Sequence, residues 1–105
     1  MVKEINGMEE FVEVVRDTPD KLIVLDFFAT WCGPCMKIGP EIDKLAEEFP
    51  NVVFRKINVD KNDEICSQLK ISSMPTFMYF KNGKYLDKSI GAVLQNIRFY
   101  VEKFK

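Results

Sequence analysis

The 105-residue chain predicts one α/β domain, spanning residues 1–105, with a central mixed β-sheet flanked by helices. The run 22–29, apolar except for Asp26, is typical of a strand that is covered on both faces, and residues 52–59 predict a second buried strand. Segments with helical spacing separate these runs, and strands that alternate with helices predict parallel pairing. Asn82-Gly83 lies between two further strand-like segments and predicts an antiparallel hairpin. The expected element order is β-α-β-α-β-α-β-β-α.

The first half of the chain predicts two strands and two helices. Residues 2–5 favour a short first strand, and the run 22–29 favours a longer second one. The helix between them is expected to end at Thr-Pro-Asp, residues 18–20. A second helix runs from Pro34 to about Phe49 with Pro40 in its interior. The apolar stripes that predict these helices are Met8, Phe11, Val12 and Val15, and then Ile38, Ile42, Leu45, Ala46 and Phe49.

The second half predicts three strands and two helices. The strand over 52–59 is followed by a short helix over about 62–70. Thr76–Lys81 and Lys84 to about Ser89 flank Asn82-Gly83 and form the hairpin. The apolar stripe of the last helix is Leu94, Ile97, Val101 and Phe104.

Composition limits the classes of partner and the cellular compartment that the sequence is compatible with. A net charge of −1 gives no sign of nucleic acid or an anionic membrane as a partner. The longest apolar stretches are far short of the roughly 20 residues of a membrane span, and the first residues lack the apolar core of a signal peptide. Three cysteines cannot build a disulfide framework of the secreted kind. We therefore expect a cytoplasmic protein.

Two cysteines lie in the sequence Trp31-Cys32-Gly33-Pro34-Cys35, at the predicted joint between a strand and a helix. A helix N-terminus carries partial positive charge and free N–H groups, so it favours a thiolate over a thiol. The thiolate is the form that attacks disulfides. The motif therefore predicts a nucleophile and a resolving partner within five residues.

Two other interpretations of this cysteine pair are possible. A structural zinc site needs four Cys or His ligands, whereas the chain has no histidine and only Cys66 besides the pair. We therefore expect no metal. An inert pair of core cysteines conflicts with the Gly33-Pro34 turn and with Trp31, which favour an exposed loop. Without histidine, proton transfer must use Asp, Glu, Lys, Tyr or the cysteines themselves.

Asp26 is a carboxylate inside an apolar strand, where desolvation disfavours the charged form. It either escapes to a sheet edge or serves as a proton acceptor with a raised pKa beside the thiols. Lys56, between Arg55 and Ile57 in the next predicted strand, is either its charge partner or an ordinary solvated lysine.

Two more positions allow alternatives. Pro75 follows Met74 just before a predicted strand, and only about 5–6% of X–Pro bonds in folded proteins are cis, so the statistical expectation is trans. Cys66 lies among Ile65, Leu69 and Ile71 at helical spacing. It is expected to be a small buried apolar residue, with a regulatory thiol as the alternative.

Several short segments of the chain form a specific combination. They are Asp26-Phe27, Ala-Thr-Trp-Cys-Gly-Pro-Cys at 29–35, Pro40, Asp60, Met-Pro-Thr-Phe at 74–77, Lys-Asn-Gly at 81–83 and Gly91-Ala92. Together they resemble the thioredoxin family over the whole length, with 29–35 closest to animal cytosolic members and 56–60 closer to bacterial ones. The resemblance implies the thioredoxin fold, with Cys32 as the attacking thiolate and Cys35 as the buried resolving thiol. It implies that Asp26 accepts or relays the Cys35 proton.

The same resemblance implies a substrate groove. Pro75 would be cis after all, which places the main chain of Met74 beside Cys32 to pair with an extended client segment. Gly33, Pro34 and Lys56 would tune the redox pair. The rim of the groove would be formed by Trp31, Asp60, Thr76, Gly91 and Ala92.

The sequence therefore predicts a general protein thiol–disulfide reductase. The resemblance implies disulfide-containing client proteins and recycling by a separate NADPH-dependent flavoenzyme, a thioredoxin reductase. The chain is expected to act as a monomer and to bind no cofactor, because it has no G-x-G-x-x-G fingerprint. One departure from the family is Met36, where lysine usually follows the second cysteine; the charge moves to Lys37, about 100° around the helix. We expect it to affect partner preference.

Two rival functions remain open. One is a binding module in which the dithiol is a redox-gated docking site. The other is an oxidant or isomerase, which Gly33-Pro34 argues against.

Overall fold

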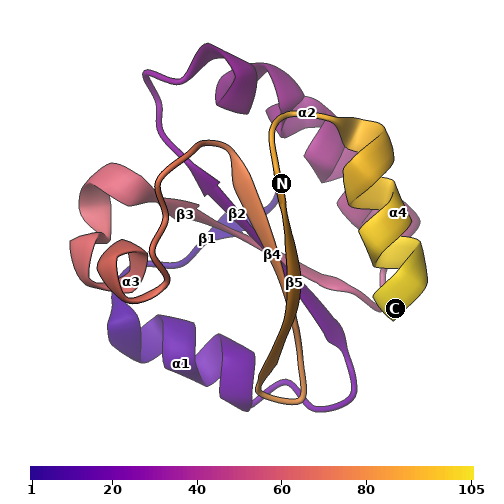
Figure 1. Cartoon of the computed structure of the whole chain (residues 1–105). Helices are drawn as coiled ribbons and strands as arrows, with labels where there is room; N and C mark the ends of the chain where they lie inside the picture. The colour runs from indigo at the N-terminus through magenta and orange to yellow at the C-terminus, as the bar shows by residue number, and fades with distance from the viewer.

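The computed structural model describes all 105 residues, and a five-stranded mixed sheet lies at its centre (Figure 1). The strand order is β1-β3-β2-β4-β5. The pairs β1–β3 and β3–β2 are parallel, and the pairs β2–β4 and β4–β5 are antiparallel. The α/β fold class and the element order are confirmed. In chain order the elements are β1 (Lys3–Glu4), α1 (Met8–Arg16), β2 (Leu22–Phe28), α2 (Gly33–Glu48), β3 (Val53–Asn58), a 3-10 turn (Val59–Lys61), α3 (Asp63–Gln68), β4 (Thr76–Lys81), β5 (Lys84–Ile90) and α4 (Leu94–Phe104).

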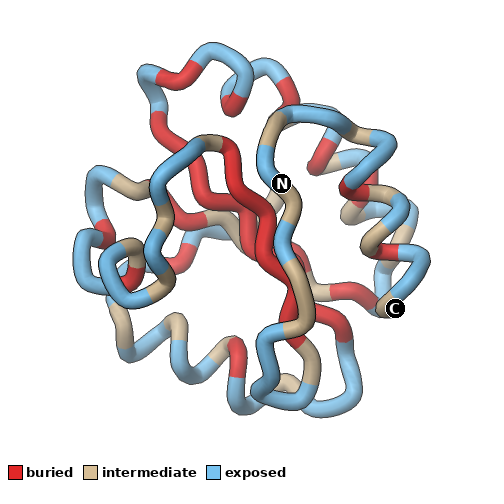
Figure 2. Tube along the Cα trace, in the orientation of Figure 1, coloured by how far each residue is buried: buried red, intermediate tan, exposed pale blue.

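Helices cover both faces of the sheet, with α1 and α3 on one side and α2 and α4 on the other (Figure 1). Because side chains alternate along a strand, β2 contributes Val24 to the cluster under α2 and α4 and Leu25 to the cluster under α1 and α3. All residues from Leu22 to Ala29 are buried (Figure 2). The sequence expectation that this run is covered on both faces is therefore confirmed.

The first helix differs in one detail from its predicted stripe. Val15 is buried, but Val12 is 37% exposed, and Val14 packs against the core in its place. The reason is the contact of Phe11 with Phe80, whose rings meet edge to face at 6.2 Å between centroids. This contact turns the Phe11 side of the helix inward, so that Val14 faces the sheet and Val12 faces water.

The hairpin forms where the sequence predicted it. Asn82 and Gly83 both have positive φ, 53° and 76°, as a type I′ turn requires, and Lys81 lies opposite Lys84. No helix is both long enough and apolar enough to cross a membrane.

One end of the sheet collects the residues around the cysteine motif. Phe28 at the end of β2 lies beside Asn58 at the end of β3, because these strands are parallel. Thr76 opens β4 at the same end, and its partner Ile90 closes β5. The chain leaves β2 here and enters α2. In open α/β sheets, sites form at the carboxyl ends of strands, so this end is where a functional site is expected.

Candidate active site

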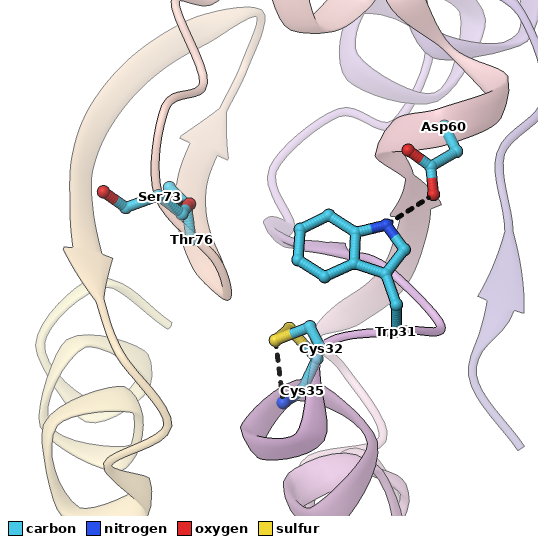
Figure 3. The surroundings of a disulfide bond; sticks show 6 residues. All are labelled: Trp31, Cys32, Cys35, Asp60, Ser73 and Thr76. Atoms are coloured by element: carbon cyan, nitrogen blue, oxygen red, sulfur yellow. Dashed lines mark hydrogen bonds between the residues drawn. A yellow bond between two sulfur atoms is a disulfide. The ribbon is translucent and has the colours of Figure 1, made fainter.

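Cys32 and Cys35 form a disulfide at the start of α2, with their Cα atoms 5.3 Å apart. Cys32 is the N-cap residue, and its Sγ accepts a hydrogen bond from the backbone N–H of Cys35 at 3.3 Å (Figure 3). This N–H is one of the free donors of the helix end, so it stabilises negative charge on Cys32 after reduction. The sulfurs are largely covered, with Cys32 7% and Cys35 4% exposed, while Gly33 and Pro34 are exposed.

The third cysteine lies on the opposite side of the sheet from the disulfide. Cys66 packs on the α1 and α3 cluster, whereas Cys32 and Cys35 form a separate cluster with Phe28 and Ala29. The three cysteines therefore cannot share one zinc ion. No group of three His, Cys, Asp or Glu side chains is placed to hold a metal.

Trp31 covers the disulfide from the side of β3. Its side chain is 68% exposed, and its indole Nε1 donates a hydrogen bond to Asp60 Oδ2 at 2.9 Å (Figure 3). Asn58 fixes the position of Asp60, because the backbone N–H of Asp60 donates a hydrogen bond to Asn58 Oδ1 at 3.0 Å. The indole thus has a fixed orientation at the surface. Asn58 was not among the predicted site residues, although its place before Asp60 is typical of a side chain that caps a turn.

The loop before β4 faces the disulfide. The Met74–Pro75 peptide bond is cis, so the statistical expectation of a trans bond is wrong and the geometry implied by the family is confirmed. Met74 packs against the disulfide cluster. The carbonyl of Pro75 accepts the N–H of Gly91 at 2.9 Å, and the Thr76 hydroxyl donates to the Ser73 carbonyl at 2.6 Å. The main-chain N–H and C=O of Met74 have no partner within the chain.

The remaining predicted groove residue, Ala92, lies across from α2. Ala92 and Pro34 line a hollow of about 490 Å³, together with Lys37, Ile38 and Glu41. Gly91 before it has φ 103°, a conformation that side chains rarely adopt. The structure thus brings the predicted rim residues together around one end of the sheet.

Asp26 is buried at the centre of the sheet and is 6% exposed, so the escape to a sheet edge is wrong. It lies on the face covered by α2, between Val24 and Phe28, and its Oδ1 has no hydrogen-bond partner. Burial raises the pKa of this carboxyl to about 7, opposed by the charge of Lys56 and assisted by that of Asp43. A carboxyl with this pKa can take up or release a proton at neutral pH.

Lys56 is half-buried and lies beside Asp26 in the register of β2 with β3. Its charge lowers the pKa of Asp26, which favours the interpretation as a charge partner. No ion pair joins the two side chains; the Lys56 Nζ instead lies 5.4 Å from the centre of the Phe28 ring. Sequence reasoning missed Phe28, although strand alternation from Asp26 places it on the same face.

Met36, the departure from the family pattern, is 50% exposed on the surface of α2, beside the exposed Lys37. Ile90 and Val93, which flank Gly91 and Ala92 in the chain, are also exposed, at 53% and 45%. The side chains that pack directly on the disulfide are apolar: Phe28, Ala29, Val59 and Met74.

Cys66 is half-buried, and burial, with smaller contributions from Asp63 and Asp60, raises the pKa of its thiol. We therefore expect slow alkylation of Cys66 by iodoacetamide in the native oxidised protein and fast alkylation after denaturation. Cys66→Ala should leave client reduction unchanged and destabilise the fold by about 1 kcal/mol or less. Rapid native labelling, measured by intact mass, would instead support the regulatory thiol.

Comparisons with known proteins agree with this site. The thioredoxin family model matches residues 2–103. The thioredoxin of Geodia cydonium is 42% identical over the full length of both chains. The Fasciola hepatica thioredoxin structure has a TM-score of 0.96 at 36% identity and covers 99% of this chain and 100% of its own. A structure from work on a yeast mitochondrial 1-Cys peroxiredoxin and its resolution by glutathione and thioredoxin systems has a TM-score of 0.91 at 30% identity, covering 97% and 94%.

These matches agree with the geometry described above. A linked cysteine pair at a helix N-terminus is the arrangement that dithiol–disulfide exchange requires. The chain therefore belongs to the thioredoxin family and is a thiol–disulfide oxidoreductase that works through the Cys32–Cys35 pair.

Proposed function

We propose that the protein is a general protein disulfide reductase in which Cys32 is the attacking cysteine and Cys35 the resolving one. The observation that carries this assignment is the hydrogen bond from the Cys35 N–H to Cys32 Sγ, because it stabilises the thiolate of Cys32 alone. Cys35 lies inside the first turn of α2 and is the more buried of the two.

The proposed reaction has two exchanges. The Cys32 thiolate attacks one sulfur of a client disulfide, a mixed disulfide forms, and the other client sulfur leaves as a thiolate that takes a proton from water. The Cys35 thiol then loses its proton and attacks Cys32 Sγ, which releases the second client sulfur as a thiolate that also takes a proton from water. The client gains two electrons and two protons, and the Cys32–Cys35 disulfide forms.

Asp26 is proposed to accept the proton of Cys35 in the second exchange. Its pKa of about 7 matches this task at neutral pH, and it lies on the sheet face that α2 covers. The charge of Lys56 is proposed to keep that pKa from rising further. Gly33 and Pro34 are proposed to tune the pair by shaping the turn between the cysteines.

The client is proposed to bind as an extended segment across the cis-proline loop. The free N–H and C=O of Met74 offer the two hydrogen bonds that an added strand would make. Trp31 and Asp60 would border the segment on one side and Gly91 and Ala92 on the other, with Pro75 and Thr76 at its floor. Exposed Met36, Ile90 and Val93 favour clients with apolar residues next to the disulfide.

Partners follow from the reaction. The oxidised protein needs a reductase, and family membership supports an NADPH-dependent thioredoxin reductase, a flavoenzyme. The similar structure from work on a yeast peroxiredoxin supports peroxide-reducing enzymes among the clients. We propose that the protein acts as a monomer in the cytoplasm.

The proposed direction of electron flow is tested by the equilibrium reduction potential against glutathione. We expect the Cys32–Cys35 disulfide to remain largely oxidised in a glutathione buffer that reduces most of a more oxidising pair. A potential well above that of glutathione, measured by alkylation and intact mass, would contradict the reductase and support the oxidant.

A further inference from the structure

Phe28 contacts both the disulfide and Lys56, which lie on different elements of the fold. It is the last residue of β2, is 6% exposed, and packs in one cluster with Ala29, Cys32 and Cys35. The other contact of its ring is with the Lys56 ammonium, 5.4 Å from the ring centre. The residue is therefore shared between the disulfide and the cation that acts on Asp26.

The position of Lys56 needs an explanation, because a lysine side chain is flexible and its ammonium is strongly hydrated. No carboxylate holds it, since the three ion pairs of the chain do not include Lys56. The face of an aromatic ring is negative and attracts a cation, and this attraction is stronger where water is partly excluded. The Phe28 ring is the contact that the structure provides for this ammonium.

Titratable groups come towards Asp26 from the elements around it. Lys56 on β3 lowers the pKa of Asp26 and Asp43 on α2 raises it. Tyr79 on β4 is neutral, and its own pKa is raised in part by the charge of Asp26. Cys35 lies on α2. Lys56 is the one cation among them. We infer that Phe28 is a positioning residue, whose ring keeps the Lys56 ammonium on the α2-covered face of the sheet, within reach of Asp26.

A consequence of this role is that Asp26 loses its cation when the ring is removed. In Phe28→Met, a side chain of similar reach without the ring, the ammonium moves out to water. The pKa of Asp26 then rises by roughly 0.5 to 1, which is less than the roughly 1 to 3 that an adjacent opposite charge accounts for, because no ion pair joins the two side chains. This expectation does not depend on catalysis; only a slower second exchange at neutral pH would rest on the proposed role of Asp26.

The experiment is a carbon-13 NMR titration of the Asp26 carboxyl in the oxidised protein, where neither active-site thiol titrates. Phe28→Met and Lys56→Met should each raise the pKa, and the double variant should match Lys56→Met alone. Phe28→Tyr keeps the ring and should keep the original pKa. An unchanged or lowered pKa in Phe28→Met, or an equal increment in both backgrounds, would overturn the inference.

A second measurement needs no variant, in case Phe28→Met does not fold. The ε-methylene protons of Lys56 should be shifted upfield by the ring current of Phe28 in the native protein. Those of the exposed Lys37 serve as the matched control. Equal shifts for the two lysines would show that the ammonium does not stay over the ring and would overturn the inference.

Discussion

Cys35→Ser is expected to accumulate covalent mixed disulfides with client proteins through Cys32, whereas Cys32→Ser is expected to trap almost none. The reason is the division of work between the two sulfurs: the first exchange needs only the Cys32 thiolate, and the release step needs Cys35. Both variants should lose turnover by roughly 10³-fold or more, because a hydroxyl is a far weaker nucleophile than a thiolate. Trapped adducts are measured by non-reducing electrophoresis and mass spectrometry.

The matched control is Cys66→Ala, introduced into both variants so that the sole remaining thiol is Cys32 or Cys35. Cys66 lies on the far side of the sheet, so we expect the Cys66→Ala substitution to change neither result. Equal trapping by the two variants would contradict the assignment of Cys32 as the attacking cysteine. A Cys32→Ser protein that kept its biological role without turnover would support the binding module.

Asp26→Asn is expected to be more stable than the wild type at pH 8 by about 1–3 kcal/mol and to lose this advantage near pH 4. Burial raises the folded-state pKa of Asp26 to about 7, whereas the unfolded chain has a value of about 3.9. Between those values the unfolded chain binds fewer protons than the folded one, so a rise in pH favours unfolding. The difference between these two pKa values corresponds to roughly 4 kcal/mol of stability lost above pH 7. The buried Asn amide lacks a full set of hydrogen bonds, and its desolvation offsets about 1–3 kcal/mol of the gain.

The same substitution should slow the second exchange at neutral pH by at least about 10-fold, because the proton acceptor for Cys35 is lost. Urea denaturation at pH 8 and pH 4, together with single-turnover reduction, measures both effects. Asp20→Asn removes an exposed carboxylate and should show neither. A variant that is less stable than wild type at pH 8 would mean that Asp26 is a well-paired structural carboxylate.

Features that depend on local pattern were predictable from the sequence. The run 22–29 is apolar except for Asp26 because β2 is covered on both faces. Asn82-Gly83 marks the hairpin between β4 and β5 because both residues must adopt positive φ. The cysteine motif could be placed at a helix start because the strand before it and the apolar stripe after it are both strong.

Features that depend on tertiary contacts were not predictable in the same way. The exposure of Val12 follows from the contact of Phe11 with Phe80, a residue distant in the sequence. The isomer of Pro75 came from the family resemblance, since residue statistics favour trans. The contact of Phe28 with Lys56 required the register of two strands to be known.

The small size of the disulfide ring has a consequence for the mechanics of a carrier of electrons. Only two residues separate Cys32 from Cys35, so the disulfide restricts the unfolded chain very little. Its entropic contribution to stability is about 2 kcal/mol, against roughly 4.7 kcal/mol for a disulfide that closes a loop of 100 residues. Neither of the two large apolar clusters contains either cysteine. The protein can therefore be oxidised and reduced repeatedly while its core packing stays the same. Its two redox forms can present nearly the same surface to different partners.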